Sequence, residues 1–165
     1  MFLKELLSLD LSNVLAVLAI AASPISELRG AIPIAIVGFH FPWYYAFLLA
    51  IIGNLLPVPF ILLFFEAISK TVSKIGIFER MLQWLFKRTR RRGKIIERYE
   101  RIGLTLFVAI PFPITGAWTG SLAAVLFGLR FKHALLSIFI GVLIAGIIVT
   151  CATLLGWSIF GLWKA

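Results

Sequence analysis

Two long apolar segments without a charged residue stand out along the chain, residues 43–65 and 134–157. Each is long enough for an α-helix to cross the hydrocarbon core of a bilayer, which takes about 20 residues. A pair of shorter apolar runs, separated by a polar or proline-rich stretch, precedes each segment. Because these runs have roughly half of the required length, none can cross alone. The pattern predicts a helical hairpin followed by a crossing helix, twice.

The first predicted hairpin, residues 14–39, carries charged side chains at its centre. Glu27 and Arg29 lie between its two apolar runs. A charged residue in the middle of a bilayer costs roughly 2.5–3.5 kcal/mol on insertion scales unless it is paired or hydrated. Irregular backbone at this depth is tolerated only where it is buried in protein or faces water. The tip is therefore a candidate functional site, and the residues expected to break its helix are Pro24, Gly30 and Pro33.

Two hypotheses explain Glu27 and Arg29. On a regular helix, residues two positions apart point to different sides. Either the tip is not helical and the two meet, or each finds a partner on the second hairpin. If they serve transport, Glu27 carries a proton while Arg29 binds an anionic group or holds Glu27 ionised. Alternatively, they form a buried bridge that only fixes the packing.

The first crossing segment is interrupted at residues 53–59. Pro57 and Pro59 lack a backbone N–H and disfavour helix just before them. The carbonyl groups freed there, together with Asn54, could line a path for a substrate. A proline kink that only shapes the packing is the equally weighted alternative.

The second predicted hairpin, residues 104–128, repeats the design of the first. Gly30 and Gly38 match Gly120 and Gly128 at a shift of 90 residues. Broken hydrophobic segments at corresponding places of a repeat commonly mark a transporter site. The side chains expected to donate hydrogen bonds to a substrate are Ser26, Thr115, Trp118 and Thr119, and the residues expected to break this hairpin are Pro111, Pro113, Gly116 and Gly120.

A basic amphipathic helix, residues 69–102, is expected to join the two halves. Eleven of the sixteen Lys and Arg residues lie between residues 66 and 101. If each hairpin enters the membrane and returns to the same side, the charge distribution follows the positive-inside rule and places this arm in the cytoplasm. The two halves would then be inverted relative to each other. Residues 1–13 are expected to form an interfacial helix.

Composition excludes several classes of protein. With 61% hydrophobic residues and a mean hydropathy of +1.04, the chain is an integral membrane protein. Cys151 is the only cysteine, and neither histidine has companions at the spacing of metal ligands. We expect no metal, no cofactor, no nucleic-acid partner and no enzyme activity, because no nucleophile–base pair is apparent.

Three stretches resemble the small multi-drug export protein family, which is similar to the DedA superfamily: residues 26–33, 53–59 and 107–120. The resemblance implies paired re-entrant hairpins in opposite orientation, proton-coupled transport and, in some members, recycling of polyprenyl-phosphate carrier lipids. DedA-type second hairpins carry an arginine after the proline. This tip offers Thr115, Trp118 and Thr119 instead.

The sequence therefore predicts a single all-α membrane domain, residues 1–165, of two inverted repeats. The predicted function is a small, proton-coupled transporter in the plasma membrane that moves an amphiphilic small molecule or a polyprenyl-phosphate-type lipid. The alternative is a membrane protein whose basic arm organises anionic lipid or recruits a partner. We expect a homo-oligomer, with Gly141 and Ala145 either at its interface or packed within the chain.

Overall fold

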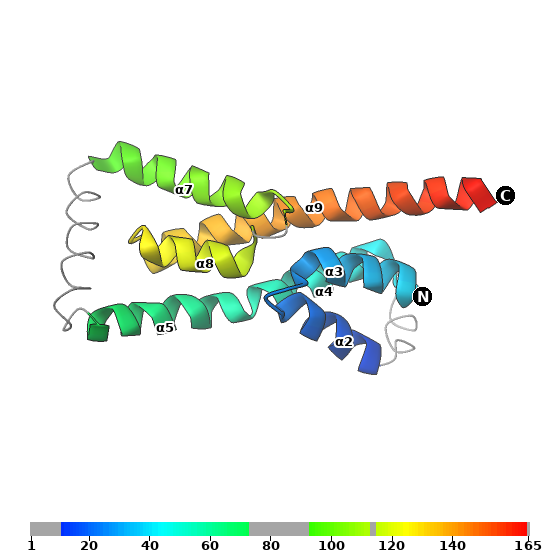
Figure 1. The fold of residues 1–165 in the computed structure, drawn as a ribbon, viewed down its shortest axis with the longest axis horizontal. Helices are drawn as coiled ribbons and strands as arrows, with labels where there is room; N and C mark the ends of the chain where they lie inside the picture. Colours follow the sequence, from blue (N-terminus) through cyan, green and yellow to red (C-terminus); the bar gives the residue numbers. More distant parts are fainter. Residues whose placement is uncertain (1–10, 73–92, 113–114, 165) are drawn as a thin grey trace. The chain divides into compact units, whose positions relative to one another are not determined.

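The structure is a computed structural model that describes residues 11–72, 93–112 and 115–164. All regular elements in these ranges are helices, which confirms the predicted all-α class (Figure 1). The chain divides into two compact units, one of residues 1–55 and 145–165 and the other of residues 56–144. Residues 1–10, most of the predicted basic arm and Pro113 lie outside the described residues.

The first unit contains a helical hairpin, α2 (Leu11–Ala22) followed by α3 (Glu27–Pro33) and the π-helix η1 (Ile34–Gly38) (Figure 1). Helix α2 has 12 residues and is about 18 Å long, too short for the ~30 Å core of a bilayer. Residues 11–13 are the first described residues of α2, and residues 1–10 of the predicted interfacial helix lie outside the described part of the chain. Gly30 and Pro33 are both helical, so the expected break takes the form of a change from α- to π-helix after Pro33.

Helix α4 (Trp43–Leu55) follows the hairpin and packs against α2 and α3 (Figure 1). His40 has a φ of 54° and ends the second leg, and the Phe41 N–H donates back to the Ala35 carbonyl (2.9 Å). The Pro42 carbonyl then accepts from the backbone N–H groups of the first turn of α4, at 3.0 Å. These bonds reverse the chain so that α4 returns along the hairpin.

The second unit contains α5 (Pro57–Val72), α7 (Gly93–Ala109), α8 (Ala117–Leu126) and the first part of α9 (Phe131–Lys164). Helix α8 packs against α5 and α7 (Figure 1). Helix α7 runs as one helix through the boundary expected between the arm at residue 102 and the hairpin at residue 104, so this boundary stays a prediction. Gly103 has open space around it, so nothing in the packing forces a break there.

After the second hairpin, as after the first, a residue with a positive φ is followed by a residue whose carbonyl accepts from the first turn of the next helix. Gly128 has a φ of 69°, and the Leu129 N–H donates to the Ala124 carbonyl (2.9 Å). The Arg130 carbonyl accepts from the first turn of α9 at 2.9 Å, as Pro42 does in α4. By its positive φ Gly128 resembles His40, whereas the match of Gly128 with Gly38 rests on residue identity and stays a prediction.

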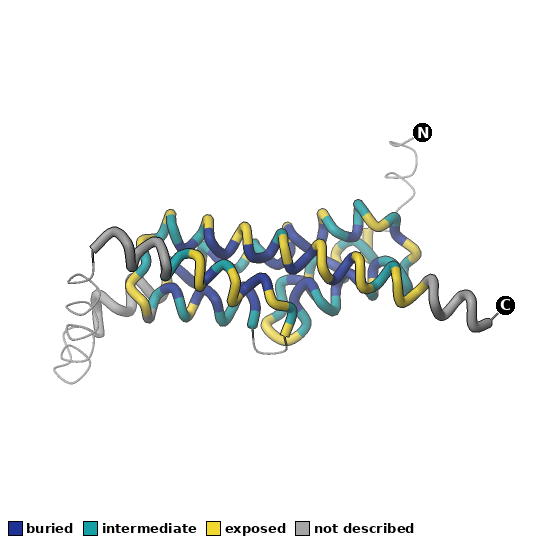
Figure 2. The backbone as a smooth tube through the Cα atoms, turned by 90° about the horizontal axis from the view of Figure 1, so that it is seen from above, coloured by how far each residue is buried: buried dark blue, intermediate teal, exposed yellow. Residues whose placement is uncertain are grey.

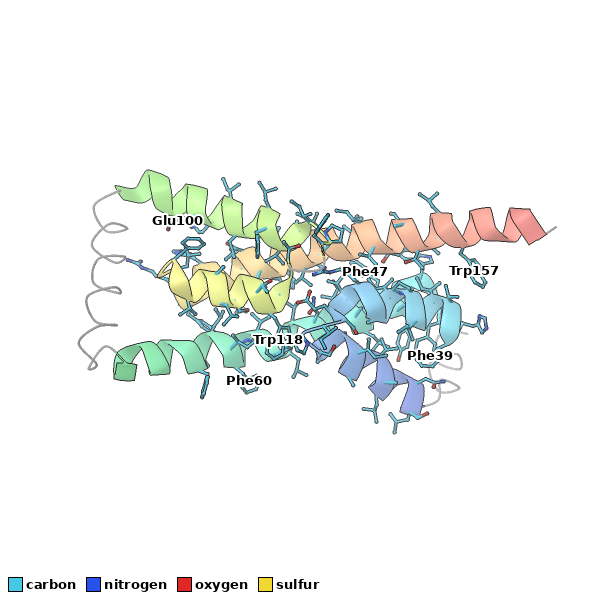
Figure 3. The ribbon with its side chains drawn as sticks, viewed as in Figure 1. Phe39, Phe47, Phe60, Glu100, Trp118 and Trp157 are labelled. Atoms are coloured by element: carbon cyan, nitrogen blue, oxygen red, sulfur yellow. The ribbon has the colours of Figure 1, made fainter. Side chains whose placement is uncertain are left out.

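Among the described residues, two helices are long and apolar enough to cross a membrane, Trp43–Phe64 and Phe131–Trp157. The first is interrupted only at Leu56, between α4 and α5. Large apolar side chains are exposed at every fourth position of the sequence here, at Leu48, Ile52, Leu56, Phe60 and Phe64. Figure 2 shows exposed residues recurring along the helices, and Phe60 is labelled in Figure 3. In a bilayer such a stripe contacts lipid, so exposure that would be costly in water is tolerated.

Small residues of α9 are used for packing within the chain. A side chain on Gly141 would begin 2.9 Å from the Thr105 carbonyl oxygen of α7, and one on Gly146 would begin 2.8 Å from the Phe47 ring of α4. Ala145 is buried. Of the two roles considered for Gly141 and Ala145, the structure shows the intramolecular one, and the predicted homo-oligomer stays a prediction.

Candidate functional site

A short turn joins the two legs of the first hairpin. The Ser23 hydroxyl oxygen accepts from the Ser26 N–H (3.2 Å), and the Ser23 carbonyl accepts from the Glu27 N–H (3.2 Å). Pro24 lies within this turn. Glu27 has a φ of 49°, in the left-handed region that a residue other than glycine rarely adopts. The turn therefore ends with a strained residue that is also the first residue of α3.

Glu27 and Arg29 form an ion pair, with 3.1 Å between Arg29 Nη2 and Glu27 Oε2. Of the two alternatives, the structure therefore shows that the side chains meet. The pairing of residues two apart is possible because Glu27 is not in regular helical conformation. The Glu27 side chain is 5% exposed and that of Arg29 is 23% exposed. The carboxylate is thus held inside the unit while the guanidinium reaches its surface.

Asn54 lies in the last turn of α4, in the same unit as the ion pair. It is fully buried, and neither its Nδ2 nor its Oδ1 has a hydrogen-bond partner among the described residues. The adjacent Gly53 brings α4 against the end of α2, since its Cβ position lies 2.8 Å from the Leu18 carbonyl oxygen. Helix α4 ends at Leu55, the residue after Asn54, so the predicted interruption of the first crossing segment is confirmed.

The tip of the second hairpin is closed by Thr115. Its hydroxyl oxygen accepts from the Phe112 N–H (3.2 Å), and the hydroxyl lies within donating range of the Ile110 and Phe112 carbonyls. Pro111 lies in this non-helical tip. The hydroxyl predicted to bind a substrate is therefore already engaged in the backbone of its own tip.

Thr115→Val should destabilise the chain by about 1 kcal/mol, because a methyl group in place of the hydroxyl cannot make its hydrogen bonds. Thr115→Ser keeps these bonds and should stay within a few tenths of a kcal/mol of the wild type. Unfolding of the purified chain in detergent, followed by tryptophan fluorescence, measures both. Equal stability of the two variants would contradict a closing role for this hydroxyl.

The remaining residues predicted for the site or for the hairpin breaks lie in or next to α3 and α8. Gly116 is extended and precedes α8, so a break occurs there, whereas Gly120 lies within α8. The Thr119 hydroxyl is 3.4 Å from the Gly116 carbonyl. Trp118 lies in the first turn of α8 (Figure 3), and Ser26 does not cap α3 with its side chain.

The structure thus brings Glu27 and Arg29 into contact and places Asn54 in the same unit. Thr115, Trp118 and Thr119 belong to the other unit.

Two polar residues of the first unit are missing from the sequence-based prediction. Ser23 organises the turn, and the spacing of the two serines in Ser23-Pro24-Ile25-Ser26 is a signal for such a turn. Thr150 is buried in α9, and its hydroxyl has no hydrogen-bond partner within the described part of the chain. The sequence signal for Thr150 is a hydroxyl inside an apolar run. This signal alone does not distinguish a residue that binds a ligand from one that only packs.

Metal-binding clusters are not a feature of the described residues. No group of three or more His, Cys, Asp or Glu side chains among them could hold a metal ion. The chemistry available in the first unit is that of a carboxylate, a guanidinium and a carboxamide. The carboxylate can take up and release a proton, and all three groups can bind polar or charged parts of a ligand.

Searches among curated proteins and among solved structures each return no match. A protein-family comparison matches residues 27–148. This range begins at Glu27 and includes the interruption between α4 and α5 and the second hairpin. This range covers well over half of the chain. The protein belongs to the family described as "Putative small multi-drug export protein".

Proposed function

We propose that this chain is a proton-coupled membrane exporter in which Glu27 carries the proton and Arg29 binds or senses the substrate. The observation that carries the proposal is the ion pair at the tip of a short apolar hairpin, with its carboxylate 5% exposed. An ionisable residue inside a membrane segment is expensive, and it commonly marks a substrate or proton pathway. The description of the family names export, which supports the same class of function.

The proposed cycle uses competition for Glu27. When Glu27 takes up a proton it loses its negative charge, the attraction to Arg29 falls, and the guanidinium becomes available to the phosphate or carboxylate of an amphiphile. A lipophilic cation would act differently, by replacing Arg29 beside an ionised Glu27. The substrate is accordingly an amphiphilic small molecule or an anionic carrier lipid. In either case binding and protonation are coupled because both act on one carboxylate.

We further propose that the two hairpins are re-entrant and belong to inverted repeats, with the basic arm in the cytoplasm and the chain in the plasma membrane. The apolar run of the first leg, residues 14–22, supports re-entry, because about nine apolar residues are too few to cross a bilayer. A repeat is supported by two similarities: His40 and Gly128 both have a positive φ, and the carbonyls of Pro42 and Arg130 each accept from the first turn of the helix that follows.

Substrate-induced proton flux in proteoliposomes tests the proposed function. The substrates are a panel of lipophilic cations and a polyprenyl-phosphate analogue, each applied to the wild type and to Glu27→Gln. We expect flux with at least one of them and its loss, by tenfold or more, in the variant, because glutamine cannot carry the proton. Glu100→Gln, which removes a carboxylate from α7 (Figure 3), is the control and should keep the flux. A folded Glu27→Gln protein with wild-type flux would refute the assignment.

A further inference from the structure

Five aromatic side chains gather where the second leg of the first hairpin passes into α4. The rings of Phe39 and Phe41 have their centroids 5.9 Å apart, and those of Phe41 and Tyr45 lie 5.4 Å apart. Trp43 and Tyr44 make an edge-on contact with 5.9 Å between their centroids. Phe41 is 5% exposed, whereas Trp43 is 54% exposed. This ring cluster, which includes Phe39 (Figure 3), therefore has a buried centre and an outer side at the surface of the first unit.

The composition of the ring cluster fits the boundary between water and lipid. Trp and Tyr combine an apolar ring with a polar N–H or O–H group, and in membrane proteins they are enriched at the level of the lipid headgroups. No Lys, Arg, Asp or Glu lies between Arg29 and Glu66, so these aromatic side chains are the interfacial anchors that this part of the chain offers. A candidate span of 22 residues begins at Trp43, and a core that takes about 20 residues puts its first residue near one boundary.

The second leg of the hairpin connects the ring cluster with the ion pair. Helix α3 has seven residues and η1 has five, and they follow each other from Glu27 to Gly38. Together they rise at most about 18 Å. The hydrocarbon core is about 30 Å thick, so its midplane lies about 15 Å below each boundary. Because Gly38 immediately precedes the ring cluster, a leg that enters the bilayer from rings at the headgroups brings Glu27 close to the midplane.

We propose that the ring cluster lies among the lipid headgroups and holds the Glu27–Arg29 pair close to the midplane of the bilayer. The partner of this surface is the headgroup region, and Trp43 and Tyr44 provide the contact. The proposal rests on the proposed re-entry of the first hairpin. It does not rest on export, because the depth of a residue is measured without a substrate, so either proposal can fail while the other holds.

Quenching by lipid-attached nitroxides tests both depths in the full-length chain, reconstituted into phosphatidylcholine vesicles. A fluorophore is attached to a single cysteine, at Ile25→Cys in the tip or at His40→Cys beside the rings, with Cys151→Ala in each chain. Both positions are exposed, Ile25 by 91%. The measured quantity is the ratio of quenching by a nitroxide at the end of the acyl chain to quenching by one in the headgroup. We expect this ratio to exceed one at residue 25 and to lie below one at residue 40, and the opposite result at either residue would overturn the proposal.

Two further variants test whether the rings set this depth. The double substitution Trp43→Leu and Tyr44→Leu keeps apolar side chains but removes the N–H and O–H groups that favour the headgroups. Any displacement moves the tip away from the midplane, so the quenching ratio at residue 25 should fall. Phe60→Leu changes an aromatic side chain of α5 that is 68% exposed (Figure 3), and it should keep the original ratio. An unchanged ratio in the double variant, or an equal fall with Phe60→Leu, would overturn the role of the rings.

Discussion

A chain with both Glu27→Gln and Arg29→Gln is expected to fold as stably as the wild type, whereas each single substitution should destabilise it. Breaking a buried ion pair from one side costs about 3–5 kcal/mol, because the other charge remains buried without its partner. Replacing both members with neutral groups is often neutral or stabilising. The cost of Glu27→Gln should lie below this range, since the Arg29 side chain is 23% exposed and water can solvate it. The cost of Arg29→Gln should be the larger of the two.

The same three variants separate a transport role from a purely structural bridge. If the pair only fixes the packing, the double variant should recover export together with stability. If Glu27 carries the proton, the double variant should be stable and still export nothing. Chemical denaturation in detergent gives the free energies of unfolding, and proton flux in proteoliposomes gives the activity. Recovery of export in the double variant would leave the pair as a structural element only.

Hydropathy and proline positions predicted most of the fold. The two crossing segments and the interruption before Pro57 follow from the length of apolar runs and from the missing N–H of proline, which are properties of the sequence itself. Helix boundaries inside the hairpins were less predictable. Gly30 and Gly120 were expected to interrupt their hairpins, yet both lie within helices. A single glycine lowers the stability of a helix by only about 1 kcal/mol, which tertiary packing can outweigh.

For the geometry of the site, the sequence left two alternatives open: Glu27 and Arg29 could meet, or each could find a partner on the second hairpin. Whether Glu27 meets Arg29 depends on the positive φ of Glu27, and a glutamate gives no local signal for that conformation. The similarity of His40 and Gly128 was hidden for the same reason, because two different residues both adopt a positive φ. The lack of a hydrogen-bond partner for Asn54 depends on its neighbours in space, which sequence spacing does not supply.

Alanine at Gly53 or Gly141 is expected to destabilise the chain by about 1–3 kcal/mol through overpacking. The added Cβ of Gly53→Ala would lie 2.8 Å from the Leu18 carbonyl oxygen, and that of Gly141→Ala 2.9 Å from the Thr105 carbonyl oxygen. Backbone atoms of a packed helix cannot yield as the end of a flexible side chain can. Each substitution should therefore push a hairpin leg, α2 or α7, away from the crossing helix beside it.

Gly103→Ala and Gly156→Ala are matched controls, because a Cβ at either helical position meets nothing within 4 Å. Alanine favours helix over glycine by about 1 kcal/mol, so these variants should be as stable as the wild type or more stable. Thermal unfolding in detergent compares all four. Similar losses at Gly53 and Gly141 would show that both hairpins pack on their crossing helices through the same close contact. A Gly53→Ala chain as stable as Gly103→Ala would mean that α2 does not approach α4 this closely.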